Sequence, residues 1–183
     1  MKKIINFSWE IAKTLIIALA IVFPIRYFLF QPFLIRGQSM EPNFENGDYL
    51  IVDELSYWLR EPQRGEVVVF KYPRNPSQRY IKRIIGLPGE TVEIKNGRIL
   101  VSGKVLDESV YLPEDILTDG KGFTKITLGK DQYFVLGDNR TFSSDSRLWG
   151  VLEKDKIIGR AYFRLWPVAA LAKISSPNYQ LSQ

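Results

Sequence analysis

The alternation of apolar and polar residues predicts one long helix followed by a series of β-strands. Residues 8–30 are mostly apolar, and a helix of roughly 20 such residues can cross a hydrocarbon core about 30 Å thick. Downstream, short runs rich in β-branched and aromatic residues are typical of strands. These runs occupy residues 49–53, 66–72, 79–85, 91–95, 98–101, 132–136 and 156–165. Asn96-Gly97, between two of the runs, predicts a hairpin with a type I′ turn.

Three interpretations of the apolar segment compete. A cleaved signal peptide needs a small-x-small site after the apolar region, and residues 28–32 offer none. A buried core helix is the second, but a segment that is apolar on all faces is long for this domain. An uncleaved membrane anchor is favoured, because Lys13 and Arg26 lie near its ends, where long charged side chains reach the interface. Together with Lys13, Lys2 and Lys3 predict a cytoplasmic amino terminus.

These patterns divide the chain into two parts. We expect residues 1–32 to form a cytoplasmic tip and a single transmembrane helix, and residues 33–183 to form an extracytoplasmic, mostly β domain. Within that domain, residues 106–125 are polar and rich in turn residues, which predicts a variable loop or excursion. We expect this excursion to be mobile and dispensable for chemistry.

Composition narrows the classes of function. The 183 residues have room for one domain or two small ones, and 45% hydrophobic residues are enough to build a core. The net charge of +5 is spread among strand-like segments, so we predict no nucleic-acid partner. The chain has no histidine and no cysteine, which excludes a Ser-His-Asp triad, thiol catalysis, disulfides and zinc sites of imidazole or thiolate. We predict no metal and no cofactor, and any catalysis must use Ser, Lys, Asp, Glu, Tyr or Arg.

A short segment, residues 36–42, follows the apolar stretch and opens the folded part. Gly37 removes side-chain bulk beside Ser39, and Pro42 stiffens the exit of the segment. Such a segment can hold a serine hydroxyl at an exposed edge while a second polypeptide lies against it. Taken alone, it also fits an ordinary membrane-proximal turn.

A second candidate residue, Lys82, lies in a predicted strand. Strand side chains alternate between faces, so Tyr80, Lys82 and Ile84 share one face. A lysine between two large, mainly apolar side chains is partly desolvated, which lowers its pKa and favours the neutral amine. The alternative is a surface lysine whose ammonium reaches solvent.

A third segment, residues 137–150, is dense in hydroxyl, carboxylate and guanidinium groups. Asp145 and Arg147 can form a two-bond ion pair that braces the loop, and Ser143 can hydrogen-bond an amine. A calcium loop is the rival interpretation. Arg140 and Arg147 are poor neighbours for a dication, and the ligand spacing is wrong.

Together the three segments resemble type I signal peptidases, a family of Ser-Lys peptidases. The resemblance rests on order and spacing after an anchor and extends to about Leu165. The matching motifs are Gly37-x-Ser39-Met40-x-Pro42, then Tyr80-Ile81-Lys82-Arg83 with Gly86-x-Pro88-Gly89, then Gly137-Asp138-Asn139-Arg140-x-x-Ser143-x-Asp145-Ser146-Arg147. It implies a single transmembrane helix followed by a partly open β-barrel catalytic domain.

The resemblance also implies roles for individual residues. Ser39 matches the nucleophile and Lys82 the general base, which agrees with a chain that has no histidine. Ser143 matches the hydroxyl that orients the lysine, and Asp145 and Arg147 match its supporting pair. Two positions depart from the family pattern. Gly37 lacks a serine hydroxyl that some members add to the oxyanion hole, and Asn43 replaces a frequent threonine, which we expect to matter little.

Substrate selection is expected to fall to small apolar pockets. The positions that match pocket-lining residues of the family are Ile35, Met40, Phe44, Tyr80 and Ile81. Such pockets suit preproteins with small residues, chiefly alanine, at the first and third positions before the cut. Core packing is the alternative for all five positions, and for Phe44 the two interpretations are equally weighted. The substrate is expected to add as a β-strand beside the nucleophile segment and the Lys82 strand.

The resemblance places the enzyme in the plasma membrane, in contact with lipid and with the catalytic domain outside; a thylakoid or other internal membrane remains an alternative. Two other functions stay open. A self-cleaving Ser-Lys repressor protease would need a DNA-binding domain where the apolar segment lies. A membrane-tethered β module that binds a partner protein would lack a nucleophile or a base, and both are present.

Overall fold

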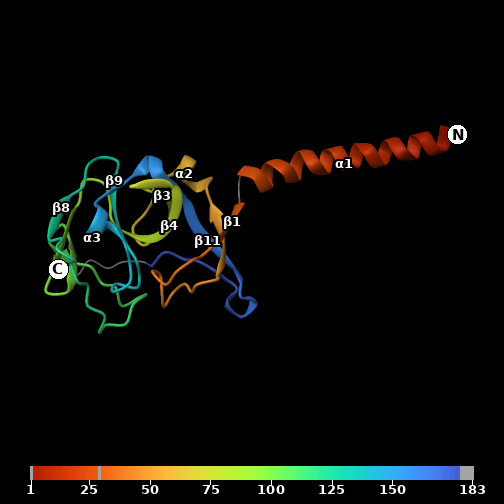
Figure 1. Ribbon diagram of the computed structural model, residues 1–183. Helices are drawn as coiled ribbons and strands as arrows, with labels where there is room; N and C mark the ends of the chain where they lie inside the picture. Colours follow the sequence, from red (N-terminus) through yellow and green to blue (C-terminus); the bar gives the residue numbers. More distant parts are fainter. Residues whose placement is uncertain (1, 29, 178–183) are drawn as a thin grey trace.

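The computed structural model describes residues 2–28 and 30–177, with side chains at 7–20 and 31–177. Helix α1 (Lys2–Phe28) extends away from the β-rich remainder of the chain (Figure 1). The helix forms where the apolar segment predicts it. In the described part of the chain, however, no helix is both long and apolar enough to cross a membrane.

Two antiparallel sheets make up the rest of the described chain. The larger has the order β1-β2-β11-β3-β4-β9-β10, with β12 paired to β11, and it is open between β1 and β10. Its strands are β1 (Phe30–Leu34), β2 (Tyr49–Asp53), β3 (Val67–Tyr72), β4 (Asn75–Gly86), β9 (Gln132–Leu136), β10 (Leu152–Glu153), β11 (Ile157–Trp166) and β12 (Ala172–Lys173). The smaller has the order β7-β6-β5-β8, with β5 (Thr91–Lys95), β6 (Arg98–Val101), β7 (Lys104–Val105) and β8 (Lys125–Thr127). The mostly β architecture predicted from the sequence is confirmed.

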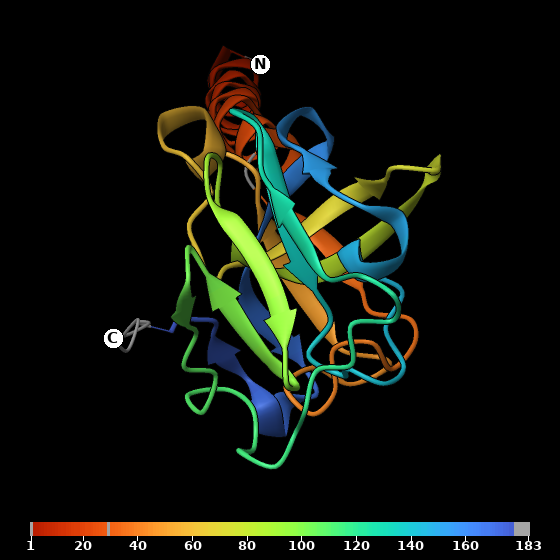
Figure 2. The same cartoon turned by 90° about the vertical axis from the view of Figure 1, so that its left-hand side faces the viewer.

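Short helical turns connect some of these strands: α2 (Ser56–Leu59), α3 (Ser146–Trp149), and the 3₁₀ turns η1 (Lys154–Lys156) and η2 (Val168–Ala170). The predicted hairpin is present as β5 and β6. Asn96 and Gly97 have φ of +52° and +74°, and a type I′ turn requires positive φ at both central residues. Figure 2 shows the smaller sheet in green beside the teal strand β9.

The central strands of the larger sheet are buried on both faces. Along β3, Val67 and Val69 pack into one apolar cluster, while Val68 and Phe70 pack into another on the opposite face. Such strands read as continuous apolar runs rather than as alternating ones. Strand β4 pairs with β3 along its length, with Val68 opposite Lys82. A lysine at this point of the sheet is therefore held inside the protein.

The segment at residues 106–125, for which mobility was predicted, packs partly into the domain. Leu106 and Leu112 are each 4% exposed, and Thr118 is 1% exposed. Leu106 joins the apolar cluster under the smaller sheet. Polar side chains of the segment, such as Glu108 and Lys121, hydrogen-bond to the loop after β9. Contacts of this kind leave no periodic pattern of apolar and polar residues in the sequence.

Candidate active site

Ser39 lies in the connection between β1 and β2, residues 35–48. The two arms of this connection are joined by backbone hydrogen bonds, from Ile35 N–H to Asp48 O at 2.9 Å and from Gly47 N–H to Ile35 O at 3.0 Å. Gly37 has φ of +95°, a conformation that other residues rarely adopt. The glycine is thus required by the backbone, and Ser39 is left half-buried at the rim of the domain.

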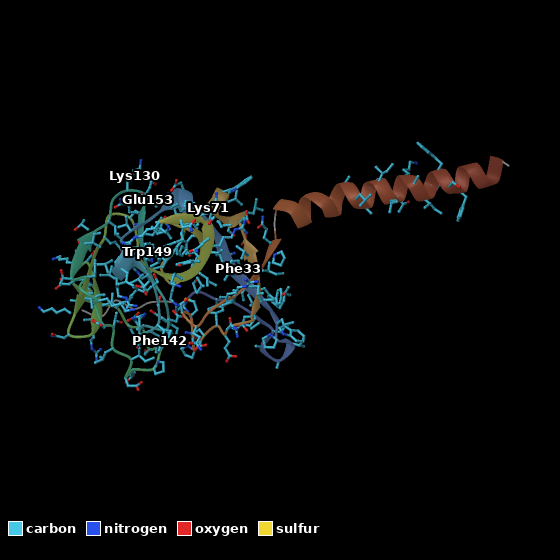
Figure 3. The ribbon with its side chains drawn as sticks, viewed as in Figure 1. Phe33, Lys71, Lys130, Phe142, Trp149 and Glu153 are labelled. Atoms are coloured by element: carbon cyan, nitrogen blue, oxygen red, sulfur yellow. The ribbon has the colours of Figure 1, made fainter. Side chains whose placement is uncertain are left out.

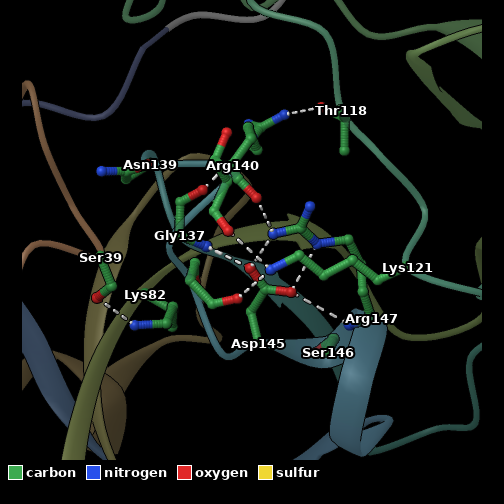
Figure 4. Close-up of polar contacts among 12 residues, drawn as sticks. Ser39, Lys82, Thr118, Lys121, Gly137, Asn139, Arg140, Asp145, Ser146 and Arg147 are labelled. Atoms are coloured by element: carbon green, nitrogen blue, oxygen red, sulfur yellow. Dashed lines mark hydrogen bonds and ion pairs between the residues drawn. The ribbon is translucent and has the colours of Figure 1, made fainter.

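Lys82 reaches Ser39 from strand β4, which is separated from β2 in the sheet by β11 and β3. Its Nζ donates to Ser39 Oγ at 2.6 Å (Figure 4) and to the Ile81 carbonyl at 2.7 Å. The side chain is buried, at 3% exposure, and its Nζ lies 5.6 Å from the centre of the Tyr80 ring. Ile84, two positions further along the strand, is fully buried. The apolar surroundings predicted for Lys82 from strand alternation are present.

This environment changes the acidity of the lysine. Burial lowers the pKa of Lys82 to about 8, while the negative charges of Asp145 and Asp138 partly oppose the shift. At pH 8 roughly half of the molecules therefore carry a neutral amine at this position. A neutral amine can accept a proton from a hydroxyl, which an ammonium cannot.

The loop after β9 is held by a buried ion pair. Arg147 donates from Nε to Asp145 Oδ1 at 2.8 Å and from Nη2 to Asp145 Oδ2 at 2.7 Å, and neither side chain is exposed. Burial alone would raise the pKa of Asp145, but the hydrogen bonds and charge of Arg147 outweigh it, so the pKa is lowered. Asp145 also accepts from Gly137 N–H at 3.1 Å. This two-bond pair is the one that the sequence predicts.

Ser143 lies beside this pair and close to the nucleophile segment. A Cβ on Gly137 would come within 2.2 Å of Ser143 Oγ and 2.4 Å of the Ser39 carbonyl, so only glycine fits between them. Asn139 N–H donates to the same Ser39 carbonyl at 3.1 Å. Among the described residues, no hydrogen bond joins Ser143 to Lys82, whose Nζ instead donates to Ser39 and Ile81.

A second buried ion pair was not predicted from the sequence. Arg83 donates to Asp138 at 2.8 Å and 2.6 Å from the opposite face of β4 to Lys82. Asn43 donates to Asp138 Oδ2 at 2.9 Å and to the Tyr111 carbonyl at 2.8 Å. Asn43, which was expected to matter little, thus links the end of the nucleophile segment to the third segment. The sequence did contain one sign of this ion pair. Arg83 follows Lys82 directly, so strand alternation puts its charge on the same face as Ile81 and Ile85, which the apolar pattern predicts to be buried.

An open cleft of about 720 Å³ lies over the Ser39–Lys82 pair. It is lined by Phe33, Leu34, Arg36, Gly37, Gln38, Ser39, Gln78, Arg79, Tyr80, Ile81, Lys82, Phe142 and Ser144. Of the five positions matched to substrate pockets, Tyr80 and Ile81 line this cleft. Ile35, Met40 and Phe44 are buried in the adjoining apolar cluster instead, where they pack with Ile81.

The geometry can support proton transfer and nucleophilic attack. A serine hydroxyl and an amine of lowered pKa lie within hydrogen-bond distance at the wall of an open cleft. Within the described ranges, no three carboxylates gather closely enough to hold a metal ion. The fold and the site therefore define a class of protein, a mostly β hydrolase-like domain with a Ser–Lys pair in a cleft.

Comparisons with known proteins identify the family. The family model described as "Signal peptidase, peptidase S26" matches residues 8–166. "Probable signal peptidase I-2" of Synechocystis sp. is 41% identical over 167 residues, which cover 88% of this chain and 75% of that protein. "Signal peptidase I" of Bacillus amyloliquefaciens is 38% identical over 177 residues, covering 91% of this chain and 90% of that protein. The chain therefore belongs to the signal peptidase family, peptidase S26, and is an enzyme of this type.

A solved structure is also similar. The crystal structure of a signal peptidase I from Enterococcus faecalis V583 is 35% identical in sequence, with a TM-score of 0.47. The matched region covers 55% of the present chain and 97% of the Enterococcus chain.

Proposed function

We propose that the chain removes signal peptides from preproteins by a Ser–Lys mechanism. The observation that carries the proposal is the 2.6 Å contact between Lys82 Nζ and Ser39 Oγ inside a cleft open to solvent. The names of the related proteins in Synechocystis and Bacillus indicate the substrate class. The two lines of support are independent, because one is local geometry and the other is similarity over most of the chain.

In the proposed reaction, the neutral amine of Lys82 takes the proton of Ser39 Oγ as that oxygen attacks the scissile carbonyl. The resulting ammonium then gives this proton to the nitrogen of the leaving amine, and the C–N bond breaks. A water molecule, deprotonated by the regenerated amine, hydrolyses the ester formed on Ser39 and releases the signal peptide. The burial that lowers the pKa of Lys82 keeps it available as a base near neutral pH.

Two groups of residues are proposed to support this chemistry. The backbone N–H of Ser39 supplies one donor to the oxyanion; Gly37 offers no hydroxyl, so a second donor must come from the backbone or from water. Asp145 and Arg147 fix the loop that carries Ser143, and we assign to Ser143 the role of orienting the lysine when substrate is bound. In the free protein, the hydrogen bonds of Lys82 go to Ser39 and Ile81.

We propose that the substrate lies in the cleft as an extended strand beside β4, whose residues 75–79 are exposed. Tyr80 and Ile81 would contact its small side chains directly. Ile35, Met40 and Phe44 would form the apolar support behind them, because they pack against Ile81 in the core. We expect this arrangement to favour small residues at the first and third positions before the cut, because the Tyr80 and Ile81 side chains line the cleft there.

The test of this function is to map the cut. The full-length chain is incubated in detergent with a preprotein, and the new amino terminus is determined by mass spectrometry. We expect cleavage after a small-x-small site, loss of cleavage when the residue before the cut is changed from Ala to Trp, and no product with Ser39→Ala. Cleavage at unrelated sites, or unchanged cleavage by Ser39→Ala, would reject the proposal.

A further inference from the structure

The excursion between β7 and β8, residues 106–125, lies directly against the proposed catalytic loop. Figure 4 shows Thr118 and Lys121 of this segment around Arg140, Asp145 and Arg147. The segment carries none of the motifs that relate the chain to its family. Its contacts with the site are therefore a feature that only the three-dimensional structure reveals.

The first set of contacts holds Arg140, near the start of the loop that follows β9. Glu108 accepts from Arg140 Nη2 at 2.6 Å and from Nη1 at 3.0 Å. Thr118 Oγ1 accepts a further hydrogen bond from Nη1, and the Gly137 carbonyl accepts from Nε at 3.0 Å. The Arg140 side chain is 2% exposed, so this charge is compensated mainly by the excursion.

The second set holds the backbone on either side of Phe142. Lys121 Nζ donates to the Ser143 carbonyl at 2.9 Å and to the Thr141 carbonyl at 3.1 Å. The Asp119 carbonyl accepts from Arg147 Nη1 at 2.8 Å. One lysine and one carbonyl of the excursion thus fix the two ends of the loop that carries Ser143 and Arg147.

The backbone of Lys121 is itself in an uncommon conformation. Its φ is +49°, in the left-handed region that lysine seldom occupies. Lys121 takes this conformation itself, even though a glycine stands on each side of it. The turn is closed by the Asp119 side chain, which accepts from Lys121 N–H at 3.0 Å. Residues in such conformations persist where the surrounding contacts hold them, and they concentrate at functional sites.

We propose that Lys121 is a positioning residue for the reaction assigned above. By holding the Thr141 and Ser143 carbonyls, it keeps the Ser143 hydroxyl and the Asp145 carboxylate in register with Lys82. Lys121 touches neither the substrate nor the reacting atoms, so its effect passes through the loop. The inference rests on the proposed function, because it assigns a role in that same site.

The experiment compares three full-length variants in preprotein cleavage. Lys121→Met keeps an unbranched side chain one atom shorter and removes both hydrogen bonds. We expect kcat to fall about tenfold, because small displacements of catalytic groups cost one to two orders of magnitude. KM should stay within about twofold. Lys121→Arg, which can still donate to both carbonyls, should recover most of kcat. The matched control is Lys130→Met, an exposed lysine that points away from the domain (Figure 3).

Two further readouts separate positioning from folding. The Tm of Lys121→Met should stay within about 2 °C of that of the wild type, while the amides of residues 141–147 exchange with deuterium faster. A Lys121→Met enzyme with wild-type kcat overturns the inference and leaves the proposed function intact. The inference is also overturned if Lys121→Arg does not restore the lost kcat, or if the loss of kcat in Lys121→Met is explained by a lower Tm. A wild-type chain that cuts no preprotein rejects the proposed function, and this inference with it.

Discussion

At the scale of single residues, Lys82 combines a chemical capability with a cost in stability. Burial brings its pKa from 10.5 to about 8, so below pH 8 the folded protein holds an ammonium in a poorly hydrated position. The unfolded chain keeps the ordinary, higher pKa. Between about pH 8 and 10.5 the unfolded state therefore binds more protons than the folded state, and stability rises with pH across this window.

We therefore expect Lys82→Met to be more stable than the wild type at pH 6. The methionine removes the buried charge, and the gain should be on the order of 2–3 kcal/mol after the loss of its hydrogen bonds. The measurement is the free energy of unfolding from urea titrations at several pH values. The difference between the two proteins should narrow as pH rises from 8 to 10.5. A variant that is less stable at pH 6, or a difference independent of pH, would contradict this interpretation of Lys82.

The sequence indicates some residues of the site better than others. Ser39 and Lys82 stand in short motifs with a definite chemical meaning, and strand alternation alone places Lys82 among apolar neighbours. The partnership of Asp138 with Arg83 and Asn43 could not be derived this way, because three segments far apart in the chain must meet to form it. The contacts of Lys121 depend on the path of a loop, which no periodic pattern encodes.

At the scale of elements, strand β4 organises the site. Its alternation directs Lys82 to Ser39 on one face and Arg83 to Asp138 on the other. Arg83 also donates to the Gly65 carbonyl at 2.9 Å, which ties the strand to the start of β3. The buried ion pair therefore fixes the position of the same strand that carries the proposed base.

Asp138→Asn should destabilise the fold strongly. The substitution removes the negative charge that accepts two hydrogen bonds from the buried Arg83 guanidinium, and breaking a buried ion pair costs about 3–5 kcal/mol. The matched control is Glu93→Gln, whose ion pair with Lys125 spans 3.7 Å at the surface and should be worth less than about 1 kcal/mol. Urea titrations of both variants measure the difference. Equal effects would show that the Arg83–Asp138 pair is not structurally important.

The elements themselves follow from the sequence to different degrees. The long apolar segment and the β-branched runs correspond to α1 and to the main strands, because their patterns extend over several residues. The strands β7, β8, β10 and β12 contain only two or three residues each, too few for a pattern to be recognised. β1 contains Pro32, which argues against a strand, and it lies at the edge of the sheet, where proline is tolerated.

At the scale of the whole molecule, α1 presents apolar side chains that no other described residue covers. The large ones described as exposed are Phe7, Trp9, Ile11, Leu15, Ile16, Ile17 and Leu19. They surround a helix that extends away from the β domain (Figure 3). Exposed apolar surface of this extent favours contact with lipid or protein. We propose that α1 attaches the enzyme to a membrane.

Membrane attachment through α1 is testable with uncharged phosphatidylcholine vesicles, which exclude attraction by the +5 net charge. The full-length wild type should float with the vesicles in a density gradient, and Leu15→Gln combined with Leu19→Gln should weaken flotation. The matched control is Leu117→Gln, which changes a leucine of the β domain that is 64% exposed. Flotation that is reduced by the control and not by the α1 variant would place the lipid contact elsewhere.

The most direct test of the whole account is the pH dependence of kcat/KM for preprotein cleavage, measured for the wild type, Ser39→Ala and Lys82→Ala. If the neutral amine of Lys82 is the base, the wild-type value should rise about tenfold per pH unit below pH 8 and level off above it. Both variants should remain folded and lose cleavage. A wild-type profile that is flat from pH 6 to 9, or cleavage by Lys82→Ala at the wild-type rate, would contradict the central claim that a Ser–Lys pair carries out the reaction.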